Sequence, residues 1–280
     1  MNETITKICS KCGSEYEAVT TSLLETKYDL SGGQCYECRR LRYEEQQRNE
    51  EATRLAEIAK KRFTWRSECG VPLKFMQAGF DTFDINREGN VKRVHALCLK
   101  YAEDFPIEYL QYIKAGKAYP SLLLFSTDVW GIGKTHLACA ICHNILNRWN
   151  GEEITCPVSF CSEPDLYRSI QATYHYTSEE RQHRENEDDI IRRLIYTPLL
   201  VLDDVGKEPR ADPKFIQRIL FAIIDGRYRK LRPIVLTTNK SPDELKYYLG
   251  GKNNQASYDR LWELTGGKFL KMTGKSYRRK

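Results

Sequence analysis

The sequence of 280 residues has no apolar run that approaches the roughly 20 residues needed to cross a bilayer. Its first residues, MNETITKICSKCG, lack the apolar core of a secretory signal. No internal repeat and no low-complexity tract is present. These absences argue against a membrane protein and an exported protein, so we expect a cytoplasmic protein with no membrane partner.

Neither hydrophobicity nor charge is extreme. Hydrophobic residues make up 41% and charged residues 29% of the chain, which is typical of a folded, soluble protein. The length allows one substantial α/β domain and a small accessory module. The formal net charge of +6 is compatible with nucleic-acid contact but does not demonstrate it. Basic residues gather near both ends, and a solvated tail is the alternative interpretation of the second group.

The ten cysteines divide into two classes by their spacing. Cys9, Cys12, Cys35 and Cys38 form two C-x-x-C pairs, a spacing typical of a zinc ribbon or treble clef. Residues 1–38 are too few for a large core, so bound Zn²⁺ would supply the missing stability. A pair of redox-active thiols is the alternative. We assign no chemistry to the remaining six cysteines.

A charged stretch over residues 39–64 separates this cysteine module from the rest. It contains no Gly or Pro and is dense in Glu, Arg, Gln, Ala and Lys, with little apolar stripe. This composition predicts an exposed connecting helix. The pattern of a packed domain begins at residue 65, so we predict three segments: 1–38, 39–64 and 65–280.

Short apolar runs alternate with helical stretches in the large segment, which predicts an α/β fold with a parallel sheet sandwiched by helices. The predicted strands are Ser121–Phe125, Pro157–Cys161, Leu199–Asp204 and Pro233–Asn239. Helices are expected after the turn that follows the first strand, near Asp165, over Phe215–Arg229, and from Pro242 and Ala256. Ligands bind such sheets at the carboxyl ends of the strands, where Asp203, Asp204 and Asn239 fall.

The segment DVWGIGKT, residues 128–135, matches the phosphate-binding pattern G-x-x-x-x-G-K-[ST] except at its first position. Its glycines would let backbone N–H groups face a phosphate at the start of the following helix. Lys134 would reach the β- and γ-phosphates, and the Thr135 hydroxyl would bind Mg²⁺. Asp128 replaces the first glycine, and its carboxylate must point outward. The predicted nucleotide-binding residues here are Gly131, Ile132, Gly133, Lys134, Thr135 and His136.

The run LLVLDDVG supplies the acidic half of this site. Asp203 is placed to hold the magnesium shell, and Asp204 to orient the attacking water. Asn239, at the end of PIVLTTN, could position that water. The alternatives are a strand that ends in two solvated aspartates and an asparagine that forms a turn.

With these motifs in place, residues 69–278 resemble the DnaC/DnaI-type replicative helicase loaders and the related IstB-like transposition ATPases, a branch of AAA+. The resemblance rests on the order and spacing of CGVPLKFMQAGFDTF, GIGKTHLACAI, LLVLDDVG, GRYRKLRPIVLTTN, SPDELKYYLG, YDRL and GKSYR. It implies that Arg260 is an arginine finger for a neighbouring subunit, with a surface arginine as the alternative. Arg278 would be a sensor or tail arginine. Phe80 and Phe83 would pack near adenine or in the core.

The resemblance implies a slow ATPase that uses ATP and Mg²⁺, binds a hexameric replicative helicase through the zinc module, and assembles with copies of itself on single-stranded DNA. Two alternatives stay open. One is an IstB-like transposition helper that assembles on duplex DNA. The other is a nucleotide-binding adaptor with negligible hydrolysis, which the replacement of the first glycine by Asp128 would allow.

Overall fold

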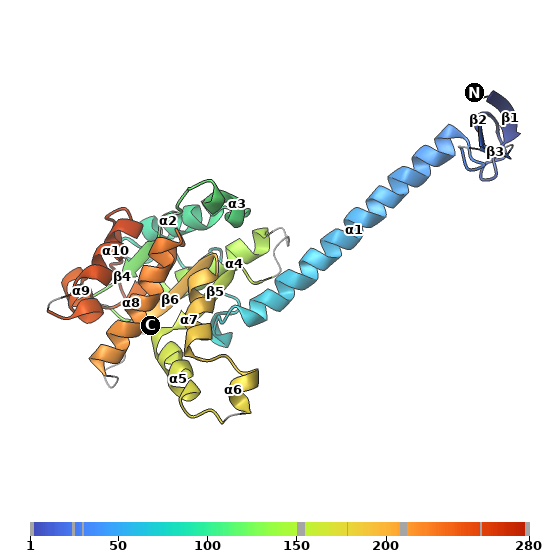
Figure 1. The fold of residues 1–280 in the computed structure, drawn as a ribbon. Coiled ribbons are helices and arrows are strands. Elements are labelled where there is room, and N and C mark those ends of the chain that lie inside the picture. Colours follow the sequence, from blue (N-terminus) through green and yellow to red (C-terminus); the bar gives the residue numbers. More distant parts are fainter. Residues whose placement is uncertain are drawn as a thin grey trace. The chain divides into compact units, whose positions relative to one another are not determined.

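The computed structural model describes residues 3–23, 26–29, 31–149, 155–177, 179–207, 212–252 and 254–277. They belong to two compact units, Met1–Lys60 and Lys61–Lys280 (Figure 1). Every helix in the described ranges is too short or too polar to cross a bilayer.

The first unit is built on a small antiparallel sheet of order β1-β2-β3. The strands are β1 (Glu3–Ile8), β2 (Glu15–Leu23) and β3 (Thr26–Asp29). The described part of residues 3–38 buries few apolar side chains: Cys9, Ala18 and Cys38. Two of these three are cysteines of the C-x-x-C pairs. Apolar burial by the described side chains alone therefore contributes little to the stability of this unit.

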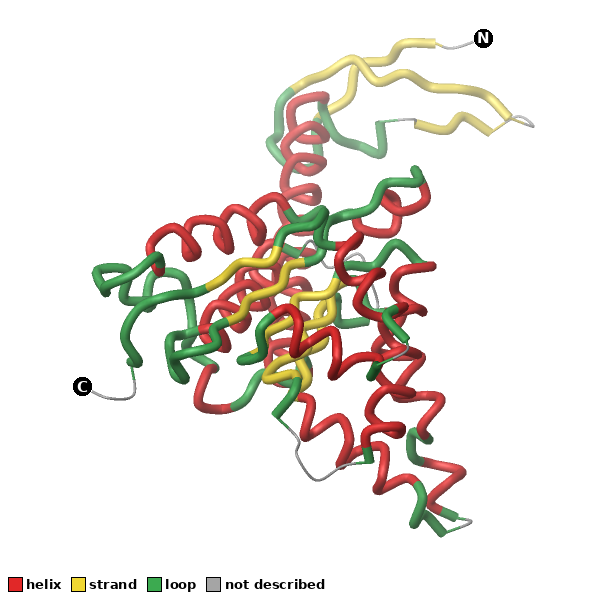
Figure 2. The backbone as a smooth tube through the Cα atoms, turned by 90° about the vertical axis from the view of Figure 1, so that its left-hand side faces the viewer, coloured by secondary structure: helices red, strands yellow, loops and turns green. Residues whose placement is uncertain are grey.

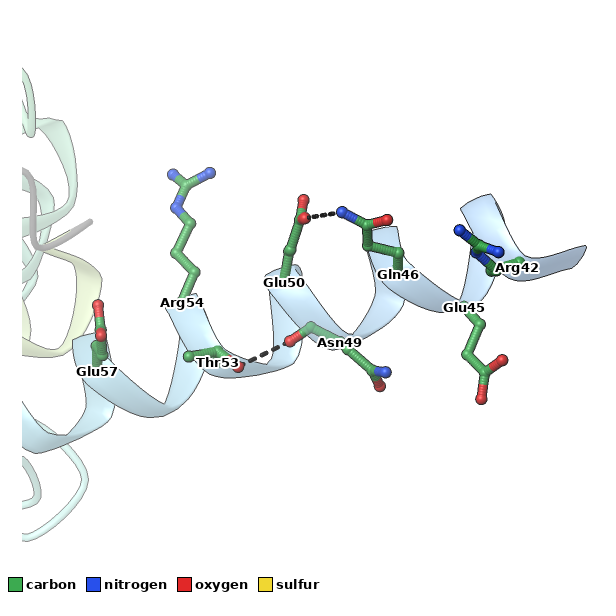
Figure 3. Close-up of a pocket in the computed structure, with 8 residues that line it drawn as sticks. All are labelled: Arg42, Glu45, Gln46, Asn49, Glu50, Thr53, Arg54 and Glu57. Atoms are coloured by element: carbon green, nitrogen blue, oxygen red, sulfur yellow. Dashed lines mark hydrogen bonds between the residues drawn. The ribbon is translucent and has the colours of Figure 1, made fainter. Parts of the chain in front are cut away.

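Helix α1 (Tyr36–Glu68) contains the predicted helix 39–64 and extends beyond both of its ends. Its exposed side chains interact along the helix, for example Gln46 with Glu50 at 2.8 Å (Figure 3). A shallow hollow on this helix is lined by Arg42, Glu45, Gln46, Asn49, Glu50, Thr53, Arg54 and Glu57. All eight belong to one helix, and no other described residue lines the hollow, so we assign it no ligand.

The second unit contains a five-stranded sheet of order β5-β6-β7-β4-β8 in which each pair of neighbours is parallel. The strands are β4 (Leu122–Phe125), β5 (Val158–Ser162), β6 (Leu199–Val205), β7 (Ile234–Thr238) and β8 (Phe269–Lys271). The prediction of four parallel strands is confirmed. Strand β8 was not predicted, because its three half-buried or exposed residues form no continuous apolar run.

Helices cover both faces of this sheet (Figures 1 and 2). Side chains alternate along each strand, so Leu124 joins one hydrophobic cluster while Leu123 joins the other. On the face of Leu124 the cluster includes residues of η1 (Leu73–Phe75), α2 (Val91–Asp104), α3 (Tyr109–Lys114) and α4 (Lys134–Arg148). On the other face it includes residues of α5 (Glu163–Thr173), α7 (Glu187–Tyr196), α8 (Pro213–Arg229), α9 (Pro242–Gly250) and α10 (Ala256–Leu264). A short helix, α6 (Glu180–His183), lies between α5 and α7 in the sequence.

Local sequence fixes where several of these helices begin. Asn186 and Asp189 form a capping box at the start of α7, as Ser241 and Glu244 do at the start of α9. Each box satisfies backbone N–H groups that the first turn leaves without partners. The predicted starts of helices at Pro242 and Ala256 are confirmed.

A fully buried arginine organises the amino ends of the central strands. The Arg227 side chain, on α8, is 0% exposed. Its guanidinium donates to the backbone oxygens of Leu194, Ile195, Thr197, Pro198 and Pro233. These carbonyls lie at the end of α7 and just before β6 and β7. One side chain therefore holds three elements in place.

We expect Arg227→Met to lower the free energy of unfolding by about 3 kcal/mol or more, because it leaves several buried carbonyls without a donor. Urea denaturation of the full chain measures this loss. Arg229→Met is the matched control on the same helix. The Arg229 side chain is 70% exposed, and its ion pair with Asp225 is its one salt bridge among the described residues, so its loss should cost less than about 1 kcal/mol. Equal losses in the two variants would contradict the role assigned to Arg227.

Candidate functional site

The loop between β4 and α4 is shaped by two glycines. Gly131 has a φ of 77° and Gly133 a φ of 111°, both in the left-handed region. Gly133 directly precedes the first residue of α4. A Cβ atom on Gly133 would lie 2.6 Å from Cε2 of Phe83, so this position excludes a larger residue for steric as well as backbone reasons. The loop thus brings its backbone to the N-terminus of α4, a favourable place for an anion.

Asp128, which stands where the sequence pattern has its first glycine, is exposed. It is not among the residues that line the cavity beside this loop. The departure from the pattern therefore adds no carboxylate to the cavity.

The side chain of Lys134 is directed to the carboxyl end of the sheet. It is only 6% exposed, and its Nζ donates to Oδ1 of Asn239 at 2.6 Å. Asn239 follows directly after β7. Two predicted site residues, 105 positions apart, are thereby in direct contact.

Asp203 lies at the centre of a hydrogen-bonded group. Its carboxylate accepts from Oγ1 of Thr135 at 3.0 and 3.1 Å and from Oγ1 of Thr237 at 2.6 Å. The side chain is 5% exposed, and this burial raises the pKa of Asp203 to about 6, against the opposing effects of the two threonine hydroxyls and Lys134. Helix α4, strand β6 and strand β7 thus meet at one carboxylate.

A β-bulge explains why two consecutive aspartates reach the same site. Leu202 pairs with Leu236, but the next pair joins Val205 to Thr238, so β6 has one extra residue. Asp204 adopts a φ of 56° within the bulge. Its backbone N–H donates to Oγ1 of Thr237 at 2.9 Å. The Thr237 hydroxyl therefore joins the two aspartates, as a donor to one and an acceptor from the other.

The turn after β6 holds a cation against the second aspartate. Nζ of Lys207 lies 2.8 Å from Oδ2 of Asp204. The turn itself is fixed by Glu163, whose carboxylate accepts from the N–H groups of Gly206 at 2.8 Å and Lys207 at 3.3 Å. Glu163 is 0% exposed and also accepts from two tyrosine hydroxyls. Burial raises its pKa, and these hydrogen bonds oppose that rise.

These groups surround a cavity of about 740 Å³. The predicted residues that line it are Gly131, Ile132, Gly133, Lys134, Thr135, His136, Asp204 and Asn239. Asp203 is not among the lining residues and contacts Thr135 from below the surface. Lining residues that the sequence did not reveal include Lys74, Phe75, Thr82, Arg87, Lys207 and Tyr277. Lys74, Phe75, Thr82 and Tyr277 lie in segments that carried the family resemblance but were given no role in the site, whereas Arg87 and Lys207 lie in none of those segments.

Of the two aromatic residues considered from the sequence, one lines this cavity and the other does not. Phe83 is 6% exposed, lines the cavity, and packs against the rings of His95 and His136. It is therefore both a core residue and a wall residue. Phe80 packs on His95 and does not line the cavity. His136 also hydrogen-bonds the backbone oxygen of Gly79 at 2.9 Å, which ties this wall to α4.

Arg260 lies apart from the cavity. On α10, its Nε is 2.8 Å from Oδ1 of Asp225 on α8, and its guanidinium lies over the rings of Phe221 and Tyr228. It is not among the residues that line the cavity of its own chain. Arg278, the other arginine singled out from the sequence, lies outside the described residues.

The four paired cysteines converge in the first unit. The Sγ atoms of Cys9, Cys12, Cys35 and Cys38 all lie within 4.8 Å of one another. Four thiolates at about 2.3 Å from a tetrahedral Zn²⁺ require similar sulfur separations, so the donor set fits this ion. The amide of Cys35 donates to Sγ of Cys9 at 3.3 Å, and this hydrogen bond is the largest of the effects that lower the pKa of Cys9 to about 6. Gly13, with a φ of 76°, allows the tight turn after Cys12.

The fold of the second unit matches solved structures. A structure of the DnaC helicase loader aligns with a TM-score of 0.53 at 20% identity, covering 72% of this chain and 100% of that one. A structure of DnaI aligns with a TM-score of 0.51 at 19% identity, covering 73% of this chain and 95% of that one. At these identities the likeness establishes the fold, which is that of an AAA+ P-loop domain.

Sequence comparison finds relatives whose names describe proteins of DNA replication. The replicative helicase loader DnaC of Escherichia coli strain K12 is 24% identical over 184 residues, which cover 66% of this chain. The match spans 64% of the length of that relative. The chromosomal replication initiator protein DnaA of Latilactobacillus sakei subsp. sakei strain 23K is 27% identical over 166 residues, or 59% of this chain and 31% of that protein.

The family model described as IstB-like ATP binding protein matches residues 122–280, more than half of the chain. The matched range includes the phosphate-binding loop, both aspartates, Asn239 and Arg260. The resemblance inferred from the sequence is confirmed, and the chain belongs to the family of IstB-like ATP binding proteins.

Proposed function

We propose that this chain is an ATP-dependent helicase loader of DNA replication in the cytoplasm. It binds ATP and Mg²⁺ in the second unit, a hexameric replicative helicase through the first, and single-stranded DNA as an assembly of several copies. The observation that carries the proposal is the convergence of Lys134, Thr135, Asp203 and Asn239 at one edge of the sheet. The similarity to a protein named as a replicative helicase loader supports it.

Different side chains of the site would have different roles in nucleotide binding. Lys134 now donates to an amide oxygen, and a phosphate oxygen would replace that acceptor. Thr135 and Asp203 supply the oxygens that would hold Mg²⁺, which neutralises phosphate charge when bound. Thr237 keeps the Asp203 carboxylate oriented toward Thr135.

One further contact favours slow hydrolysis. Asp204, the residue that would orient the attacking water, is engaged by Lys207 at 2.8 Å. Nucleotide binding releases Asn239 from Lys134, but it does not by itself break the contact of Lys207 with Asp204. That contact must be exchanged before Asp204 can act on a water molecule. Such a site suits a switch between nucleotide states better than rapid turnover.

The position of Arg260 supports a function in an assembly of identical chains. It pairs with Asp225 and lines no part of its own cavity. An arginine finger outside its own site can stabilise transition-state charge only on the nucleotide of a neighbouring copy. Arg260 is therefore the residue that we propose acts between subunits.

The first unit has the features of a docking module. Large apolar side chains are exposed on it: Ile8 at 69%, Tyr36 at 68% and Tyr43 at 64%. Aromatic residues of this kind are enriched at protein interfaces. We propose the boundaries 1–38 for the zinc module, 39–64 for the connecting helix and 65–280 for the AAA+ domain, with Zn²⁺ on the four cysteines in a structural role.

An exposed aromatic residue among cations supports single-stranded DNA binding by the second unit. The Trp262 side chain is 47% exposed and packs on Phe269 of β8. Lys268 and Lys271 flank that residue and are exposed. Stacking rings and nearby cations are the usual means by which proteins hold single strands without sequence preference.

ATP should strengthen the binding of single-stranded DNA, and Lys134→Ala should remove this effect because the cation that holds the phosphates is lost. Fluorescence anisotropy of a labelled oligonucleotide, with and without Mg²⁺–ATP, measures it. Lys100→Ala is the control, since Lys100 is exposed on α2 and does not line the cavity.

Three other outcomes would redirect the proposal. Equal DNA affinity with and without nucleotide in the unsubstituted chain would contradict a loader. Preference for long duplex DNA, with filaments visible by microscopy, would favour the IstB-like transposition helper. Nucleotide binding without phosphate release, whether or not DNA is present, would favour the adaptor.

Thr237→Val should raise the Mg²⁺ concentration needed for half-maximal ATP binding by about tenfold, because Asp203 loses the hydroxyl that orients it. Titration of Mg²⁺ at fixed ATP, followed by nucleotide fluorescence, gives this value. Thr238→Val is the matched control: its hydroxyl donates to the Val205 carbonyl and not to Asp203. If both variants need the same Mg²⁺ as the unsubstituted chain, the role given to Thr237 is wrong.

Removal of Zn²⁺ should disorder the first unit and abolish helicase capture while ATP binding is retained, because the two sites lie in separate compact units. The full chain with Cys12→Ser and Cys35→Ser tests this, by zinc content, helicase pull-down and nucleotide affinity. Cys161→Ser, in the second unit, is the control. Helicase capture by the zinc-free variant at the unsubstituted level would refute the docking role.

A further inference from the structure

Arg87 forms part of the cavity wall, yet none of the sequence motifs includes it. Its guanidinium carbon lies 4.7 Å from the centre of the Phe83 ring and 5.6 Å from that of Tyr277. The backbone N–H of Tyr277 donates to the carbonyl of Gly131 at 2.9 Å, which attaches this C-terminal residue to the phosphate-binding loop. The guanidinium is thus held by two aromatic rings at the loop.

The hydrogen bonding of this guanidinium is incomplete. Its Nε donates to the backbone oxygen of Asp84 at 2.9 Å. Its terminal NH1 is buried and has no hydrogen-bond partner among the described residues. Among those residues, no carboxylate lies within ion-pair distance of it either. Burial lowers the pKa of Arg87, although Asp84 and Tyr277 oppose this.

The other terminal nitrogen, NH2, lies beside the loop. A Cβ atom on Gly133 would be 3.3 Å from it. Gly133 directly precedes Lys134 and the N-terminus of α4. A partly desolvated cation with an unused donor, at the mouth of a phosphate-binding loop, is satisfied best by an anion with several acceptor oxygens.

We propose that Arg87 binds the phosphate chain of the nucleotide in its own chain, held in place by Phe83 and Tyr277. This rests on the proposed ATP binding and adds a second cation, from the segment before α2, to Lys134. Arg260 is proposed to act between copies, whereas Arg87 acts within one. The forked guanidinium can offer two parallel donors to phosphate oxygens, which an ammonium cannot.

The test compares ligands that differ only in their phosphates. Arg87→Gln in the full chain should weaken Mg²⁺–ATP and Mg²⁺–ADP binding by about tenfold or more, the usual worth of a charge-assisted hydrogen bond. Adenosine affinity should change by less than about twofold, since the purine contacts are retained. Arg87→Lys should give an intermediate loss. Isothermal titration calorimetry with ATP, ADP, AMP and adenosine measures all four affinities.

Arg93→Gln is the matched control, because Arg93 is exposed on α2 and does not line the cavity. Thermal unfolding without ligand checks the fold, and Arg87→Gln should show the same transitions as the unsubstituted chain at only slightly lower temperature, because it loses one exposed hydrogen bond and two ring contacts. Unchanged ATP affinity in Arg87→Gln would overturn the proposal. An equal loss of affinity for adenosine and for ATP would also overturn it, because Arg87 would then only pack in the cavity wall. Failure of the unsubstituted chain to bind ATP would instead refute the proposed function.

Discussion

The geometry of the nucleotide cavity depends on the buried carboxylate of Asp203. An almost fully buried carboxylate is costly unless its oxygens are hydrogen-bonded. Here the donors come from two different elements, Thr135 on α4 and Thr237 on β7. The need to satisfy this one group therefore fixes the helix that carries the phosphate-binding loop relative to the two strands behind it. Lys134 and Asn239 meet across the same junction as a consequence.

Two other buried charges set the ends of the strand that carries Asp203. Arg227 binds carbonyls that precede β6 and β7, whereas Glu163 binds the N–H groups of the turn that follows β6. The interior of the sheet is apolar and could tolerate a shift along the strand direction more easily than these ends can. With both ends fixed, the additional residue of β6 is accommodated as a bulge at Asp203 and Asp204. The bulge thus follows from the fixed ends of β6. It also brings both aspartates to Thr237.

Sequence patterns predicted the parts of this site that depend on local composition. Continuous apolar runs located four of the five strands described in the sheet of the second unit, and the glycines of the loop located the start of α4. The bulge could not be predicted, because register between strands is a long-range property that no local pattern records. Arg87 was missed for the same reason, since it is an ordinary residue until the fold brings it to Gly133. Tyr277 lies in the GKSYR segment, but only its hydrogen bond to Gly131 in the folded chain connects it to the site. The roles given to Arg260 and to the four cysteines remain predictions that agree with their positions.

The connecting helix α1 is followed in the sequence by a segment that lines the cavity. The last turns of α1 belong to the second unit, where Arg62 donates to the carbonyl of Trp149 at 2.8 Å. The residue after the helix, Cys69, accepts a hydrogen bond from the amide of Phe160 on β5 at 2.6 Å. A few residues later η1 begins, and two of its residues, Lys74 and Phe75, line the cavity. A partner that changes the orientation of α1 must therefore act on a segment that is bonded to the sheet and continuous with the cavity wall. If the first unit binds a helicase as proposed, this continuity would let that binding alter nucleotide affinity at the second unit, and the same coupling would then operate in the opposite direction.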